Sequence, residues 1–225
     1  MQVYLHRIRM LFKDRTEAAV LLAEKLEWLK EEGPRGSLLV LAVPRGGVVT
    51  GDVIATSLGV NLDIIVAKKI GHPSNPEVAI GAVMHDGTFI PNEAILNSLD
   101  IPYEYITDSI SILTKEIERR IMIFRGSKEY DLVGKVVILV DDGVATGTTL
   151  FLAIMWLKRQ KLRRLIIAIP VGPRETIEKL REIVDKVIVL HSPTIFKAVG
   201  AFYEDFSQVS DDEVIEIMQK YRTTN

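Results

Sequence analysis

The sequence predicts an α/β fold: a doubly wound, mainly parallel sheet of about five strands with helices on both faces. Continuous apolar runs, typical of strands buried on both faces, recur along the chain. Segments with apolar residues at helical spacing separate these runs. Several of the runs end in short glycine-rich or charged loops. In open sheets of this kind, ligands bind beyond the carboxyl ends of the strands.

The first helix and the first strand have clear boundary signals. Asp14, with Glu17 three residues later, is typical of a helix start at which two side chains cap the backbone. The Gly-Pro pair at 33–34 is expected to end this helix. The apolar run 37–43 (SLLVLAV) then predicts the first strand, and a second helix is expected over residues 48–58.

The middle of the chain changes in character. A second strand is expected over residues 62–67 and ends in Lys68 and Lys69. Residues 70–77 (IGHPSNPE) contain two prolines and are expected to form a loop. The Asp-Gly pair at 86–87 lies between short apolar pieces and predicts a hairpin. Six apolar residues spaced by three or four then predict a long amphipathic helix: Ile106, Ile110, Leu113, Ile117, Ile121 and Phe124.

The second half of the chain returns to alternating strands and helices. Three apolar runs predict the remaining core strands: 136–140, 164–169 and 186–190. Residues 191–207, which we call the hood, are irregular and rich in aromatic side chains, and a last helix is expected from Ser210. We predict a single domain over residues 1–225, with the core at about 14–190 and the hood and C-terminal helix at about 191–225.

Composition narrows the function classes. The 225 residues carry a formal net charge of −2, which gives no general attraction to nucleic acid or to an anionic membrane. No apolar run approaches the roughly 18 residues of a membrane-spanning helix, and the N-terminal residues lack a signal-peptide core. The chain has no cysteine. We therefore expect a cytoplasmic protein that binds neither nucleic acid nor membrane.

The most informative stretch follows the apolar run 136–140. Two adjacent carboxylates, Asp141 and Asp142, come first, and a small-residue loop with two further hydroxyls comes next. The N–H groups of such a loop and the positive end of the following helix dipole both favour an anion. Carboxylates do not serve a phosphate directly, so we expect them to bind sugar hydroxyls or the water shell of a metal. The pattern indicates a ligand with a sugar next to a phosphate.

A second loop suited to anions follows the first strand. It reads Pro44, Arg45, Gly46 and Gly47. The glycines allow backbone amides to approach an anion, and the arginine supplies a planar charged fork. Taken alone, this tetrapeptide is read equally well as a plain turn.

The segment 141–149 (DDGVATGTT) resembles the ribose-phosphate loop of the type I phosphoribosyltransferases, and residues 44–47 stand where that family has its pyrophosphate loop. The resemblance implies the family's fold and the transfer of ribose-5-phosphate from 5-phosphoribosyl-1-pyrophosphate to a nitrogenous base or another nucleophile, with release of pyrophosphate. It also implies Mg²⁺ as cofactor, a mobile loop near the site, a strained or cis peptide in the pyrophosphate loop, and a homodimer.

The resemblance assigns roles to individual residues. Asp141 and Asp142 are expected to hold the ribose hydroxyls and, through water, Mg²⁺, and Lys69 is expected to assist catalysis. The residues expected to bind substrates are Arg45, Gly46, Gly47, Lys68, Val144, Ala145, Thr146, Gly147, Thr148, Thr149, Phe196 and Tyr203.

Several of these assignments have plainer alternatives. A lysine pair at a strand end is more often solvated than functional. The hood side chains Phe196, Lys197, Phe202 and Tyr203 are candidates to contact the acceptor, and the aromatic ones are equally candidates for core or dimer interface.

Ala145 stands where the hypoxanthine-guanine enzymes place a carboxylate, which counts against a 6-oxopurine acceptor. A non-catalytic sensor of phosphoribosyl pyrophosphate or of a nucleotide is the alternative to an enzyme.

Overall fold

The structure is a computed structural model that describes residues 11–33, 36–98 and 100–222. Two expectations fall outside these ranges. One is the absence of a signal-peptide core, which rests on residues 1–10, and the other is the role of Pro34 in ending the first helix.

Five parallel strands form the central sheet, in the order β2-β1-β6-β7-β8. This order confirms the predicted doubly wound sheet, because the chain builds outward from β1 in both directions. Both β1 and β6 are buried along their whole length, as their continuous apolar runs predict. The strands are β1 (Leu38–Ala42), β2 (Asn61–Ile64), β6 (Val136–Val140), β7 (Arg164–Val171) and β8 (Lys186–His191).

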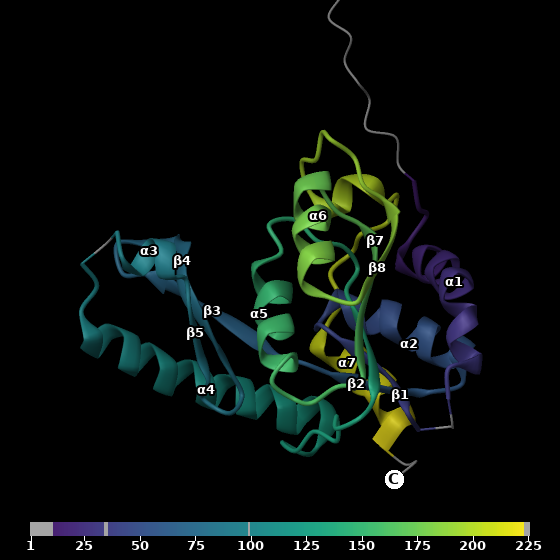
Figure 1. The fold of residues 1–225 in the computed structure, drawn as a ribbon, viewed down its shortest axis with the longest axis horizontal. Coiled ribbons are helices and arrows are strands. Elements are labelled where there is room, and N and C mark those ends of the chain that lie inside the picture. The colour runs from purple at the N-terminus through teal and green to yellow at the C-terminus, as the bar shows by residue number, and fades with distance from the viewer. Residues whose placement is uncertain (1–10, 34–35, 99, 223–225) are drawn as a thin grey trace, which may run out of the picture.

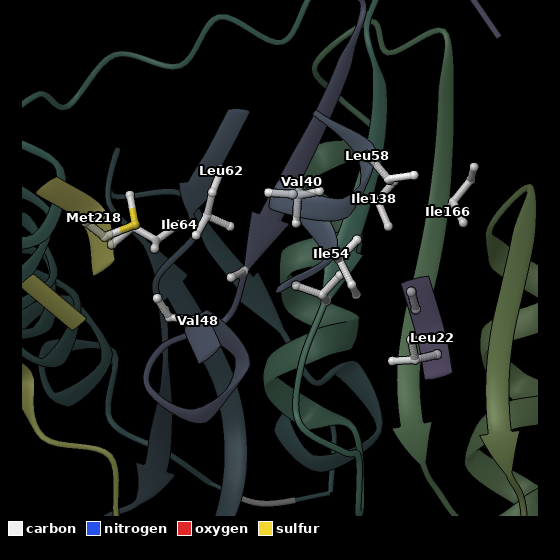
Figure 2. Packing of buried hydrophobic residues seen from close by; sticks show 14 of the residues in the cluster. Leu22, Val40, Val48, Ile54, Leu58, Leu62, Ile64, Ile138, Ile166 and Met218 are labelled. Atoms are coloured by element: carbon white, nitrogen blue, oxygen red, sulfur yellow. The ribbon is translucent and has the colours of Figure 1, made fainter. Parts of the chain in front are cut away.

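Helices cover both faces of this sheet (Figure 1). Successive side chains of a strand point to opposite faces, so β1 contributes Val40 to one core cluster and Leu41 to another. Val40 packs in the cluster that includes Leu22 and Ile54, as Figure 2 shows. The helices of that face are α1 (Arg15–Leu26), followed by the short η1 (Glu27–Glu31), α2 (Gly46–Leu58) and α7 (Asp211–Arg222); those of the other face are α5 (Thr148–Leu157) and α6 (Arg174–Ile183).

Side-chain caps are present at the starts of α1 and α7. The backbone N–H of Glu17 donates to Asp14 Oδ1 over 2.9 Å at the start of α1. At the start of α7, the N–H of Glu213 donates to Ser210 Oγ over 3.1 Å, and the N–H of Ser210 donates to Glu213 Oε2 over 2.7 Å. These bonds satisfy N–H groups that have no acceptor within the helix.

A second, antiparallel sheet and two helices project from the core as an arm (Figure 1). The sheet has the order β3-β4-β5, and the turn between β4 and β5 contains Asp86 and Gly87, which confirms the hairpin predicted there. The long amphipathic helix α4 is also confirmed and packs against this sheet. The arm consists of β3 (Ala67–His72), β4 (Asn75–Met84), β5 (Phe89–Pro91), α3 (Glu93–Leu96) and α4 (Tyr103–Arg125).

The prediction for residues 62–77 was wrong in two respects. The core strand β2 ends at Ile64, and a new strand in the other sheet begins at Ala67, so Lys68 and Lys69 lie inside β3 instead of at a core strand end. The segment expected to be a loop pairs as β3 and β4 around a turn at Pro73. Register shifts on either side of the residue at position 71 accommodate the irregular pairing near this turn.

Several contacts tie the arm to the core, and two of them include the ring of Tyr130. Arg125, the last residue of α4, donates two hydrogen bonds to the Asp63 carboxylate of β2, over 2.7 and 2.8 Å. Its guanidinium also lies 4.1 Å from the ring centroid of Tyr130. The second contact is made by His85, whose ring centroid lies 4.8 Å from that of Tyr130 and 5.0 Å from that of Trp156. Burial lowers the pKa of His85, which favours its neutral form.

The hood packs onto the sheet beside the first residues that the structure describes. The N–H groups of Leu11 and Phe12 donate to the carbonyl oxygen of Phe202, which belongs to the short helix η2 (Val199–Phe202). Phe12, Phe202 and Tyr203 are buried together in a small aromatic cluster. None of the helices that the structure describes is long and apolar enough to cross a membrane.

Candidate functional site

The two anion loops predicted from the sequence meet at the carboxyl ends of two neighbouring strands of the sheet. Strands β1 and β6 are direct neighbours, and from them the chain winds toward opposite edges. Their carboxyl ends therefore flank the switch point of the sheet, where α/β proteins of this class form a crevice for ligands. The loop after β1 (residues 43–47) and the loop after β6 (residues 141–147) line this point.

Two glycines let these loops touch. A Cβ on Gly47 would lie 2.9 Å from Asp141 Cα and 3.1 Å from the Val140 carbonyl oxygen. A Cβ on Gly46 would lie 1.8 Å from Asp142 Oδ2. Neither position has room for a side chain. The glycines were predicted to expose amides to an anion, and the structure shows that they also bring the first loop against the acidic pair.

The first loop opens helix α2 earlier than predicted. The helix begins at Gly46, so the amides of Gly46 and Gly47 belong to its first turn, where N–H groups have no acceptor within the helix. The peptide bond between Pro44 and Arg45 is cis, as the resemblance led us to expect. Arg45 Nη1 lies 3.3 Å from Asp211 Oδ1, at the start of α7.

The two adjacent carboxylates have different surroundings. Asp141 is partly buried, and the desolvation of its carboxyl, together with the neighbouring Asp142, raises its pKa well above the ordinary value. Asp142 instead forms an ion pair with Arg15, in which Nε and Oδ2 are 2.6 Å apart. The N–H of Asp142 donates to Asp141 Oδ1 over 2.9 Å. Asp142 thus has a counter-ion for its negative charge, whereas the charge of Asp141 is poorly compensated.

The small-residue loop ends in the first turn of α5. Gly147 has a φ of 77°, a left-handed conformation that a glycine adopts without strain. The hydroxyls of Thr146 and Thr148 are 3.2 Å apart at the mouth of the loop. On the inner side, Thr176 Oγ1 donates to the carbonyl oxygen of Ala145 over 2.9 Å. This bond turns that carbonyl inward, which suits a loop that presents N–H groups to an anion.

An open pocket of about 580 Å³ lies between this loop and the arm. The core side is formed by Asp141 and residues 143–150, which include every predicted residue of the ribose-phosphate loop except Asp142. The arm side is formed by Lys69, Val78, Ala79, Asn92 and Ile95. The pocket therefore has a polar, amide-rich wall on the core and a mostly apolar wall on the arm.

The two predicted lysines have different environments. The exposed Lys69 lines the pocket. Lys68 points to α4, where its Nζ lies 2.9 Å from Glu116 Oε1, and this contact lowers the pKa of Glu116. Neighbouring residues of a strand face opposite sides of its sheet, which explains why the structure brings one lysine to the pocket and the other to the arm helix.

Comparison with known proteins identifies the family. Residues 12–207 match the family described as phosphoribosyl transferase domain. The chain belongs to this family. It is 36% identical to TT1426 from Thermus thermophilus, whose crystal structure superposes with a TM-score of 0.80 over 94% of this chain and 99% of that one. It is also 33% identical over 211 residues to a protein from two Mycobacterium tuberculosis strains that is provisionally named a phosphoribosyl transferase.

The match to the mycobacterial proteins covers 93% of this chain but 47% of their length. The chain thus spans about half the length of the curated relatives it matches. Their names state a transferase class and no acceptor. The family is therefore established by sequence, and the acceptor has to be sought in the site itself.

The hood residues predicted to contact substrate, Phe196 and Tyr203, are not among the residues that line this pocket. Tyr203 is buried in the core, and its hydroxyl donates to the Asp142 carbonyl oxygen over 2.6 Å. Phe196 is partly buried against Phe202, with ring centroids 5.3 Å apart. The structure thus places both residues, predicted to contact substrate, in the packing of the hood. These positions agree with the alternative given from the sequence, in which the aromatic side chains of the hood belong to the core.

Sequence reasoning missed several residues that reach the site from distant elements. Arg15 of α1 and Asp211 of α7 each pair with a charged residue of the two loops. Asn92 and Ile95 line the pocket from the arm. None belongs to a local motif, and their positions follow only from how α1, α7 and the arm pack on the sheet. The sequence around each of these residues has the ordinary alternation of polar and apolar positions, and this alternation does not indicate that the residue lies near the site.

Proposed function

We propose that this phosphoribosyl transferase domain transfers ribose-5-phosphate from 5-phosphoribosyl-1-pyrophosphate to an acceptor nucleophile and releases pyrophosphate. One observation carries the proposal. The loop that suits a 5′-phosphate and the loop that suits a pyrophosphate are in contact at Gly46 and Gly47, with Asp141 and Asp142 between them. A ligand with a sugar between two anionic ends matches this order of groups.

The proposed roles follow from the contacts. The 5′-phosphate is held by the amides of residues 145–149 and the hydroxyls of Thr146, Thr148 and Thr149, at the positive end of α5. Arg45 and the first-turn amides of α2 hold the pyrophosphate, and Lys69 contributes a positive charge from the arm. Asp141 and Asp142 accept hydrogen bonds from the ribose hydroxyls. Lys68 has a structural role in the arm in this assignment.

The proposed reaction exchanges two bonds at C1 of the ribose. The bond from C1 to the pyrophosphate oxygen breaks, and its electron pair leaves with the pyrophosphate. A lone pair of the acceptor, for example on a ring nitrogen of a base, forms the new bond to C1, and the acceptor's proton passes to solvent. Positioning of the two ends and stabilisation of the leaving charge account for catalysis of this kind.

Mg²⁺ is the cofactor that we propose. The residues present supply two carboxylates for it, and the remaining ligands would be water and substrate. Among the described residues, no group of three or more His, Asp or Glu side chains is arranged to hold a metal. Asp141 and Asp142 supply hard oxygen atoms. Mg²⁺ commonly binds through one or two carboxylates, several waters and substrate phosphates. When bound with the substrate, the ion would neutralise charge on the pyrophosphate.

Pyrophosphate release tests this function directly. Purified protein is incubated with phosphoribosyl pyrophosphate, Mg²⁺ and one free base at a time, and pyrophosphate is measured. The proposal predicts base-dependent release by the wild-type protein. It also predicts that the double substitution Arg45→Ala and Asp142→Asn weakens phosphoribosyl pyrophosphate binding at least about tenfold, because it removes charge-assisted contacts at both ends of the sugar. Calorimetric binding unchanged by this double substitution would contradict the assignment.

A non-catalytic sensor is the second candidate, and one observation favours it. Phe196 and Tyr203 pack within the hood and are not among the residues that line the pocket. Tight binding of phosphoribosyl pyrophosphate with no turnover on any base tested would support the sensor over the enzyme.

We also propose that the protein is a homodimer and is located in the cytoplasm. Light scattering of the purified protein tests the homodimer.

A further inference from the structure

An arginine outside both loops reaches the proposed sugar site. Arg15 is the first residue of α1, and its side chain is largely buried, with 11% of its surface exposed. Its Nε lies 2.6 Å from Asp142 Oδ2, and its Nη1 donates to the Ser207 carbonyl oxygen over 2.8 Å. The guanidinium also lies 3.9 Å from the ring centroid of Phe206. Contacts on its edges and its face therefore fix the guanidinium in one orientation.

The same guanidinium adjoins the loop proposed for pyrophosphate. A Cβ built on Gly46 would lie 3.0 Å from Arg15 Nε as well as 1.8 Å from Asp142 Oδ2. The absence of a side chain at this position gives the ion pair its place directly beside the first turn of α2. Three separate parts of the chain, α1, the loop after β1 and the loop after β6, thus converge on one carboxylate.

We propose that Arg15 is a positioning residue that holds the Asp142 carboxylate in the orientation needed to accept from a ribose hydroxyl. This inference rests on the proposed function. A carboxylate has two oxygens, and Arg15 fixes one of them, which orients the other. Without Arg15, Asp142 would rotate and repel the nearby pyrophosphate. Arg15 does not itself contact the substrate in this account.

Calorimetric titration of phosphoribosyl pyrophosphate with Mg²⁺ tests the inference in a double-mutant cycle. The four proteins are the wild type, Arg15→Ala, Asp142→Asn and the double variant. Arg15→Ala is expected to weaken binding by about tenfold or more, the usual scale for removing a group that orients a ligand-binding side chain. In the Asp142→Asn background, Arg15→Ala is expected to have little further effect, because the group that Arg15 orients is already altered.

Two further variants separate positioning from simple loss of an ion pair. Arg164→Ala is the matched control. Arg164 also forms an ion pair, in which its Nη1 lies 2.6 Å from Glu32 Oε1. Arg164 is the first residue of β7 and therefore lies far from the carboxyl ends of the strands. It is expected to bind phosphoribosyl pyrophosphate as the wild type does. Arg15→Lys keeps the charge and is expected to restore part of the lost affinity. Thermal melts verify that each variant is folded.

The outcomes are distinct. Loss of affinity in Arg15→Ala, with little added loss in the double variant, supports positioning. Unchanged or stronger binding by Arg15→Ala overturns it, and so does an equal loss in the Asp142→Asn background, which would show that Arg15 acts independently of Asp142. If the wild type fails to bind phosphoribosyl pyrophosphate, the proposed function fails first and the inference falls with it.

Discussion

At the scale of single residues, the adjacent carboxylates Asp141 and Asp142 differ in how the fold treats their charge. Asp142 has Arg15 as a counter-ion, whereas burial raises the pKa of Asp141. A raised pKa means that the folded state favours the protonated form, so stability from this group is present at low pH and is lost as pH rises through the folded-state value. Above the ordinary pKa of an aspartate, this carboxyl therefore opposes folding of the ligand-free protein.

This difference gives opposite predictions for two amide substitutions. Asp141→Asn is expected to stabilise the ligand-free protein at pH 7 by about 1 kcal/mol or more, because it removes a group whose ionised form the folded state disfavours. Asp142→Asn is expected to destabilise it, because Arg15 loses its partner. Thermal melts at several pH values measure both. The stabilisation by Asp141→Asn should shrink as pH falls, and a stabilisation that is the same at acidic and neutral pH would contradict the assigned cause.

The neighbouring lysines give a second residue-scale prediction. Lys69→Ala is expected to weaken phosphoribosyl pyrophosphate binding by about tenfold, since a charge-assisted contact contributes roughly 1.5–3 kcal/mol. Lys68→Ala is the matched control and is expected to leave binding nearly unchanged, because Lys68 pairs with Glu116 on the far side of β3. Calorimetry compares the two. Equal losses in both variants would show that the lysines share one role.

At the scale of elements, the arm depends on the contacts that fix α4 to the core. The Arg125 and Asp63 side chains are 9% and 19% exposed, so their ion pair is well shielded. Its geometry is bidentate, and Tyr130 covers the guanidinium. Because Lys69 and Asn92 reach the pocket from the arm, the position of the arm affects the site.

Breaking this ion pair should cost stability. Arg125→Ala is expected to lower the free energy of unfolding by about 2–4 kcal/mol, because it leaves the Asp63 carboxylate buried without its partner. Urea denaturation measures the change. The double variant Arg125→Ala and Asp63→Ala serves as the control and is expected to be more stable than Arg125→Ala alone. A double variant that is less stable than Arg125→Ala would show that the ion pair is not the source of the effect.

The elements differ in how far the sequence predicts them. The core strands were predictable because each is a continuous apolar run between turn signals. The run 62–67 misled the prediction because both sheets bury their residues, so apolar character continues where the chain leaves β2 and enters β3. Residues 70–77 were expected to be a loop because of their prolines, but Pro73 lies in the turn and the pairing shifts register beside it.

The candidate site was predictable where local motifs form it. The loops at 44–47 and 141–149 carry their own signals, and strand order brings them together. Arg15 and Asp211 were not predictable, because only tertiary packing places α1 and α7 beside these loops. The burial of Tyr203 was not predictable, because an aromatic residue in an irregular segment has the same sequence pattern whether it faces a ligand or the core.

At the scale of the whole molecule, the site is the meeting point of three parts. The switch point of the sheet provides two amide-rich loops, α1 provides the counter-ion of Asp142, and the arm closes the pocket with Lys69. The central claim is that one ligand spans both loops, with its sugar at the acidic pair. Neither loop alone distinguishes this from a simple phosphate site.

A crystal structure of the protein with phosphoribosyl pyrophosphate and Mg²⁺ tests this claim most directly. The 5′-phosphate is expected within about 3 Å of the amides of residues 145–149, and the pyrophosphate at the same distance from the amides of Gly46 and Gly47. The ribose hydroxyls should lie on Asp141 and Asp142. A pyrophosphate seated in the loop at 145–149, with Gly46 and Gly47 making no contact to the ligand, would contradict it.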